Sequence, residues 1–89
     1  MTKEEAIEKA KRDLATRLGI DESQVAEQSL SDADFPDMAL GAAASGEMSG
    51  QMITKGWRIQ LDGSGTTYEY RADKTKLRLC NFKGKNYKV

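Results

Sequence analysis

The first twenty positions carry apolar residues at helical spacing. They recur at intervals of three, four and four: Ile7, Ala10, Leu14 and Leu18. This spacing lines one face of a helix. Thr2 and Glu5 have the spacing of a capping box, and Gly19 is typical of a helix C-terminus. The pattern predicts a helix that ends just before Gly19.

From residue 51 the apolar residues occur at every second position, which is typical of strands with one buried face. Strands are predicted from Ile53 to Leu61, from Thr66 to Ala72 and from Lys76 to Phe82. The apolar residues on their shared face are Trp57, Ile59, Leu61, Tyr68, Tyr70, Leu77 and Leu79. We expect this face to meet Ile7, Leu14 and Leu18 of the helix. The basic residues alternate to the other face, which is expected to face solvent.

The middle of the chain has weaker periodicity. A short strand is predicted for residues 24–30, and a long loop for residues 31–50. That loop starts with a polar turn at 31–34, and its small residues predict a flexible loop at 41–51. Residues 83–89 are either a frayed tail or a final short strand.

These elements predict one domain, residues 1–89, of the α+β class. One N-terminal helix packs on a three- to four-stranded antiparallel meander, because a sheet with one apolar face needs a cover. An 89-residue chain has the size of a single domain. The acidic loop between the strand predicted at 24–30 and the meander is expected to lie free outside the sheet.

The composition excludes several kinds of chemistry. The chain has no histidine and one cysteine, Cys80, so it lacks the base of a Ser-His or Cys-His site and the ligands of a zinc site. We therefore expect no enzyme, no cofactor and no metal, and a packed or half-buried thiol at Cys80. No apolar run approaches the ~20 residues of a membrane span, so the expected location is the cytoplasm.

Charge is unevenly distributed. Residues 21–50 carry seven acidic groups and no basic one, whereas residues 51–89 carry nine basic and three acidic groups. Two interpretations stay open: the segments offset each other, or the second forms a basic face for an anionic partner. The residues of such a face would be Arg58, Arg71, Arg78, Lys83 and Lys85.

Several segments together resemble a known group of domains. They are Phe35-Pro36-Asp37-Met38-Ala39-Leu40-Gly41, Gly56-Trp57-Arg58-Ile59-Gln60-Leu61, Tyr68-Glu69-Tyr70-Arg71 and Leu79-Cys80. In this order they resemble small bacterial domains of uncharacterised function, which carry an aromatic-Pro-Asp-x-x-Leu-Gly-Cys-Pro loop, a Tyr-x-Tyr-His strand and a late Cys. That group is in turn loosely similar to peptidase-propeptide domains, which also lay a helix over an antiparallel sheet.

The chain departs from this group at two places. Ala42-Ala43 replaces the Cys-Pro of the loop, and Arg71 replaces the His. The resemblance implies that the two cysteines of other members pin the loop to the last strand. Such a disulfide is excluded here, so a looser segment is expected at 42–51.

The leading functional hypothesis is a non-enzymatic module that binds a protein or peptide partner through the 31–51 loop and the adjoining sheet edge. The candidate partner-binding residues are Phe35, Asp37, Leu40, Gly41 and Trp57. Asp37 is expected to accept backbone N–H bonds, and Phe35 and Leu40 to anchor the loop near Trp57. Alternatively, the loop and Trp57 form one wall of a ligand cleft. The alternative function is binding of nucleic acid or an anionic surface by the basic strands.

Overall fold

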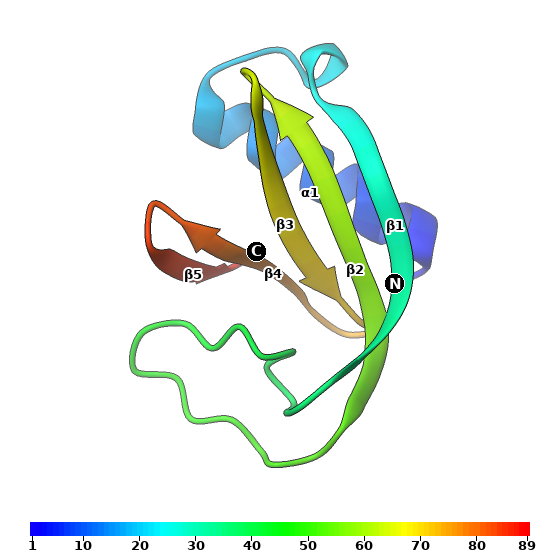
Figure 1. The fold of residues 1–89 in the computed structure, drawn as a ribbon, viewed down its shortest axis with the longest axis vertical. Helices are drawn as coiled ribbons and strands as arrows, with labels where there is room; N and C mark the ends of the chain where they lie inside the picture. The colour runs from blue at the N-terminus through cyan, green and yellow to red at the C-terminus, as the bar shows by residue number, and fades with distance from the viewer.

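The computed structural model describes residues 1–89 as one helix packed against one antiparallel sheet (Figure 1). The helix α1 spans Lys3–Leu18, and a short 3-10 helix, η1, spans Glu22–Gln24. Five strands lie side by side in chain order: β1 Ala26–Phe35, β2 Thr54–Gly63, β3 Thr66–Ala72, β4 Leu77–Phe82 and β5 Lys85–Lys88. The α+β meander is therefore confirmed, with five strands in place of three or four.

Both ends of α1 are fixed by the residues that the sequence indicates. Thr2 Oγ1 accepts a hydrogen bond from Glu5 N at 3.1 Å, and the Glu5 carboxylate accepts one from Thr2 N at 2.8 Å. This reciprocal pair is the predicted capping box. Gly19 ends the helix with φ +68°, in left-handed backbone that glycine adopts at little steric cost.

The buried face of α1 is rotated slightly from the predicted stripe. Ala6, Ala10 and Leu14 follow one another at intervals of four and are fully buried. Ile7 and Leu18 pack at the margin of the core and are only partly buried. The sequence pattern gave weight to large apolar residues, whereas the centre of this contact consists mainly of alanine methyl groups.

The core between α1 and the sheet consists of alternate strand residues. Its innermost strand members, each at most 1% exposed, are Ile59, Leu61, Tyr70, Ala72, Leu77 and Leu79. Trp57 and Tyr68 pack against this core and are partly buried. The Tyr70 hydroxyl donates a hydrogen bond to Asp13 Oδ2 at 2.7 Å, and Arg17 Nε donates to the same oxygen at 2.7 Å. Burial, followed by the Asp13 carboxylate, raises the pKa of Tyr70 well above its usual value.

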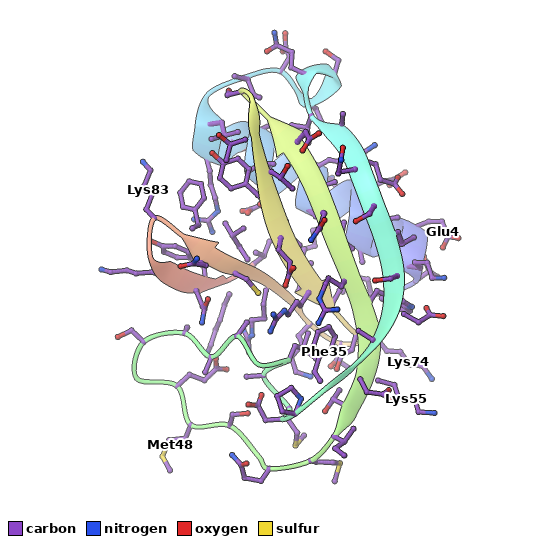
Figure 2. All side chains as sticks on the ribbon, viewed as in Figure 1. Glu4, Phe35, Met48, Lys55, Lys74 and Lys83 are labelled. Atoms are coloured by element: carbon purple, nitrogen blue, oxygen red, sulfur yellow. The ribbon has the colours of Figure 1, made fainter.

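Strand β1 is longer than predicted. The expected turn at 31–34 is the second half of this strand, which pairs with β2 from Ser31 opposite Arg58 to Phe35 opposite Thr54. Phe35, labelled in Figure 2, is the last residue of the strand. Because β1 lies at the edge of the sheet, its polar side chains remain in water while its backbone pairs with β2. An edge strand of this kind lacks the alternation that reveals a strand in a sequence.

Both chain ends are attached beside the start of β4. The tail forms β5, which is the second of the two alternatives, and Val89 N donates a hydrogen bond to Leu77 O at 3.0 Å. The Met1 ammonium group donates to Lys74 O, also at 3.0 Å. The two acceptors are three positions apart in the sequence, so the two termini lie close together in the fold.

Candidate functional site

The segment that joins β1 to β2, residues 36–53, is called the connector below and lies against the sheet face opposite α1. Three side chains of β3, β4 and β5 hold it there: Arg71 Nη1 donates to Leu40 O at 3.0 Å, Arg78 Nη2 to Glu47 Oε2 at 2.6 Å and Asn86 Nδ2 to Ala43 O at 3.1 Å. The expectation that the connector lies free outside the sheet is therefore wrong. The outer face supplies hydrogen-bond donors for which the connector supplies acceptors.

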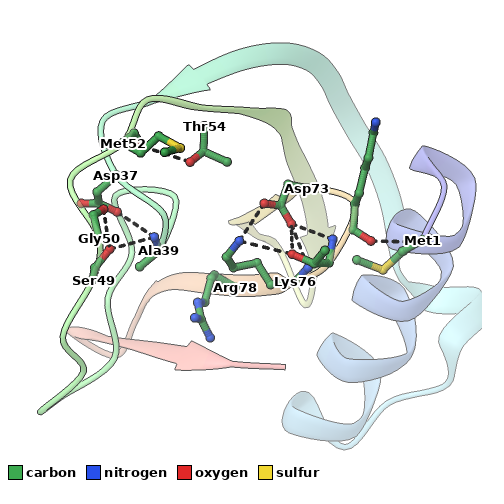
Figure 3. Close-up of polar contacts among 12 residues, drawn as sticks. Met1, Asp37, Ala39, Ser49, Gly50, Met52, Thr54, Asp73, Lys76 and Arg78 are labelled. Carbon is green, nitrogen blue, oxygen red and sulfur yellow. Dashed lines mark hydrogen bonds and ion pairs between the residues drawn. The ribbon is translucent and has the colours of Figure 1, made fainter.

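Asp37 shapes the first part of the connector. Its Oδ1 accepts hydrogen bonds from Ala39 N at 2.9 Å and from Gly41 N at 3.0 Å. The predicted structural role of Asp37 is thus confirmed. The hydrogen bond from Gly41 N, reinforced by the one from Ala39 N, lowers the pKa of Asp37 below its usual value. Ser49 Oγ, from the returning part of the connector, accepts from Ala39 N at 3.0 Å and closes the loop (Figure 3).

A strained turn follows Asp37. Leu40 and Gly41 both have left-handed backbone, with φ +61° and +67°. For a leucine this conformation costs roughly 1 kcal/mol. Leu40 is nevertheless completely buried. Four buried apolar residues lie outside the helix-side core, and we call them the connector-side group: Phe35, Ala39, Leu40 and Ala42.

Arginine side chains lie over the Phe35 ring on the outer face. The guanidinium carbons of Arg58 and Arg71 are 5.7 Å and 5.4 Å from the ring centroid. Such cation–π contacts are favourable, and they add to the burial of the ring. Phe35 thus anchors the beginning of the connector on the face of the sheet that carries the basic residues.

Four cations form one row across the outer face. Strand register places these residues directly opposite one another in succession: Arg58, Arg71, Arg78 and Lys88. Like charges in such positions repel each other. Glu69 offsets part of the repulsion through Arg71, at 2.8 Å, and Arg58, at 3.5 Å.

Glu47 of the connector offsets the other part. Its Oε2 lies 2.6 Å from Arg78 and 3.6 Å from Lys88. Its Oε1 accepts a hydrogen bond from Ala44 N at 2.9 Å, which lowers the pKa of Glu47 below its usual value, helped by the two cations. The acidic middle and the basic C-terminal part of the chain thus meet at this point, as one of the two interpretations of the charge pattern states.

The five candidate partner-binding residues are not brought together on one surface. Phe35 and Leu40 are buried on the outer face, whereas Asp37 beside them is half-buried and Gly41 is exposed. Trp57 belongs to the helix-side core. Phe35 and Leu40 are therefore buried as anchors, but not near Trp57. A cavity walled by Trp57 is present, and three residues of the predicted 31–51 loop line it: Asp32, Ala33 and Asp34, all on β1.

The basic residues of the alternative hypothesis also divide into two groups. Arg58 and Arg71 are half-buried and Arg78 is buried, and all three have carboxylate partners. Lys83 and Lys85 lie at the exposed β4–β5 hairpin, at which Figure 2 labels Lys83. The outer face of the sheet was expected to face solvent. The connector instead covers part of it.

Sequence reasoning missed Glu47, Asn86 and the exposed apolar residues of the connector. The four large apolar side chains that are exposed all lie in this segment: Met38 at 45%, Met48 at 97%, Met52 at 62% and Ile53 at 73%. One signal for Glu47 was available, because it is the single charged residue between positions 38 and 54.

The remaining chemistry is limited. No group of three or more His, Cys, Asp or Glu side chains is arranged to hold a metal ion. Burial raises the pKa of the half-buried Cys80 thiol, which lowers its thiolate fraction at neutral pH. The single helix lacks the length and apolar character needed to cross a membrane.

The fold and the site define a small α+β domain in which a connector, not a second helix, covers the outer face of the sheet. Residues 7–80 match the family model of a domain of unknown function (DUF8738), and the chain belongs to this family. The match covers most of the chain and agrees with the resemblance to small uncharacterised domains. No curated protein and no solved structure matched the chain.

Proposed function

We propose that this domain is a non-enzymatic interaction module that binds an extended, basic segment of another protein. The segment would lie along the free edge of β1 and contact the neighbouring connector. The observation that carries this proposal is the location of the four exposed large apolar side chains, all on the connector. Three of them are methionines, whose flexible side chains adapt to different contact surfaces.

The edge of the sheet supports strand addition. β1 has a neighbour on one side only, so its other side presents backbone groups to which an extended segment can pair. Ile53 directly precedes Thr54, the residue that pairs with Phe35 at the end of β1. Exposed apolar side chains of the connector therefore begin where the edge strand ends.

Charge supports a basic partner. Residues 21–50 carry seven acidic groups and no basic one. The Asp32 side chain on β1 is 85% exposed, although Lys3 lies 3.7 Å from it. Carboxylates along an edge disfavour pairing with a second copy of the same strand, and they attract lysine and arginine.

The proposal is tested with two synthetic peptides of equal length, which alternate valine with either lysine or glutamate. The ¹⁵N-labelled domain is titrated with each peptide and observed by NMR. The lysine peptide is expected to shift the amide signals of 30–35 and 50–55, and the glutamate peptide to leave them unchanged. Ile53→Ser should weaken binding by about tenfold, since an exposed isoleucine buried on binding contributes on the order of 1.5 kcal/mol.

Lys83→Ser, at the distant β4–β5 hairpin, is the matched control and should bind the lysine peptide like the unchanged chain. Equal binding of both peptides, or shifts confined to β5 and its hairpin, would contradict the proposal. Unchanged affinity in Ile53→Ser would remove the connector from the site.

A cytoplasmic location and a bacterial origin belong to the same proposal, as does the loose likeness to peptidase-propeptide domains. The alternative function, binding of nucleic acid, receives less support from the geometry. Three of its five basic residues already contact Glu69 or Glu47.

A further inference from the structure

Arg78 has a buried N–H group without a partner. The residue is 7% exposed, and its Nε atom makes no hydrogen bond within the chain. Its Nη2 atom bonds to Glu47 Oε2, but Glu47 Oε1 is occupied by the N–H of Ala44. Glu47 thus satisfies only one side of the guanidinium fork. A buried donor of a cation that finds no acceptor is costly, so a further acceptor is expected at this place.

A cavity of about 240 Å³ opens beside Arg78, between the connector and the start of β4. Its polar lining includes Glu47, Ser49, Lys76 and Arg78. Lys76 directly precedes β4 and Arg78 is the second residue of that strand, and both residues line the cavity. Figure 3 shows both residues beside each other, with the Lys76 Nζ atom 2.7 Å from Asp73 Oδ2.

The cavity has a local excess of positive charge. Its lining carries two cations, Lys76 and Arg78, and one carboxylate, Glu47. Lys88 and Asp73 lie outside the lining: Lys88 Nζ is 3.6 Å from Glu47 Oε2, and Asp73 Oδ2 is 2.7 Å from Lys76 Nζ. An anion that enters the cavity would therefore meet net attraction, even before the Glu47 carboxylate moves.

We infer that this cavity binds a phosphate group, for which the Glu47 carboxylate is a built-in competitor. A phosphate has enough oxygens to accept from Nε and Nη2 of Arg78 together, in the bidentate geometry that guanidinium groups favour. It leaves a further oxygen for Lys76 or Lys88. The cavity shares Met38 and Met48 with the exposed apolar side chains of the proposed partner site, but none of its lining residues lies on β1, so phosphate binding and strand addition are tested separately.

The test follows the Nε–H signal of Arg78 by ¹⁵N NMR during titration with inorganic phosphate, at constant ionic strength maintained with chloride. The signal is expected to shift with saturation, whereas that of Arg12, on the solvated face of α1, should not. Glu47→Gln removes the competing charge and should tighten binding by about tenfold. A parallel titration with glycerol 3-phosphate distinguishes the source: tighter binding of the ester assigns a phosphorylated small molecule, and equal binding assigns free phosphate.

Arg78→Lys keeps the positive charge and removes the fork, and it should lose at least about tenfold in phosphate affinity, measured through neighbouring amide signals. Arg58→Lys, in the same cation row but outside the cavity, is the matched control and should bind normally. A linear shift of the Arg78 signal that equals the shift of Arg12 would overturn the inference and leave a water molecule as the acceptor. Equal affinity of Arg78→Lys and the unchanged chain would overturn it as well.

Discussion

The two faces of the sheet are covered by different kinds of contact. On the helix side, twelve buried residues form one core cluster. On the connector side, only the four residues of the connector-side group are apolar and buried. Hydrogen bonds and ion pairs supply the other contacts that hold the connector on the sheet. Burial of apolar area does not depend on ionisation, whereas contacts of Asp37 and Glu47 do. The same sheet therefore has one cover that depends mainly on apolar burial, with one carboxylate contact at Asp13, and one whose contacts depend mainly on ionised carboxylates.

The largest expected effect concerns the helix side. Leu79→Ala should lower the free energy of unfolding by about 3 kcal/mol, because it removes a fully buried side chain from the centre of the core. Urea denaturation measures the change. Leu30→Ala is the matched control, since Leu30 is only partly buried at the margin of the same core and should cost about half as much. Equal losses would show that the core is not centred beneath α1.

Position 40 sharpens the comparison, because burial and backbone strain oppose each other there. Leu40→Ala should cost about 3 kcal/mol, since the buried side chain is lost while the left-handed backbone stays strained. Leu40→Gly loses the same side chain but relieves roughly 1 kcal/mol of strain, so it should cost about 2 kcal/mol. Thermal or urea unfolding should show that the glycine variant is more stable than the alanine variant.

The opposite order is expected at Leu79, which has no positive φ. There Leu79→Gly should be less stable than Leu79→Ala by about 1 kcal/mol, because glycine adds the entropy cost of ordering a freer backbone. The same order at both positions would contradict the strained turn.

Acid should release the connector before it affects the helix side. The pKa values of Asp37 and Glu47 are lowered, so their contribution to stability is fully present above the usual carboxyl pKa, near 4, and is lost as the pH falls through their folded-state values below it. Amide exchange of residues 37–50 should therefore accelerate below pH ~4, while that of β2 and β3 stays slow.

Glu47→Gln provides the control for this experiment. The variant should show faster exchange around Ala44 already at neutral pH, and little further change there in acid. If amide exchange in β2 and β3 accelerates at a higher pH than amide exchange in the connector, the proposed difference in pH dependence between the two covers is wrong.

The smallest effect is expected at Lys88. Its side chain is 61% exposed, and it lies 3.6 Å from Glu47, whereas Arg78 is buried and lies at 2.6 Å. Because exposed ion pairs contribute little, Lys88→Ala should change Tm by less than about 2 °C. Differential scanning calorimetry measures this value. A much larger loss would mean that Lys88, not Arg78, is the main partner of Glu47.

The helix side was predictable because its signals are local. A helical period, a capping box and strict alternation in β2 to β4 depend on neighbouring residues, and they place Ile59, Leu61 and Tyr70 correctly in the core. The second half of β1 gave no such signal, because an edge strand tolerates polar side chains on both faces. The sequence therefore predicted three or four strands, whereas the sheet has five.

The candidate site was predictable only where local turn chemistry decides. The Pro36-Asp37 pair indicated a carboxylate that bonds backbone N–H groups, and it does. The relation of Phe35 to Trp57 depended on the register of β1 with β2, which shifts between Glu27 and Ser29 and was not accessible from spacing. The contact of Glu47 with Arg78 joins residues 31 positions apart, and no periodic pattern encodes such a pair.

The meeting of the two termini beside β4 has a practical consequence. Since Met1 and Val89 attach to backbone groups only three positions apart, a short peptide can join them, and the chain can be reopened within the connector. Such a circular permutant would keep every pair of neighbouring strands, while the connector that covers the outer face would be opened at a chosen residue. Permutants opened before and after Glu47 would then show separately what each half of the connector contributes to stability.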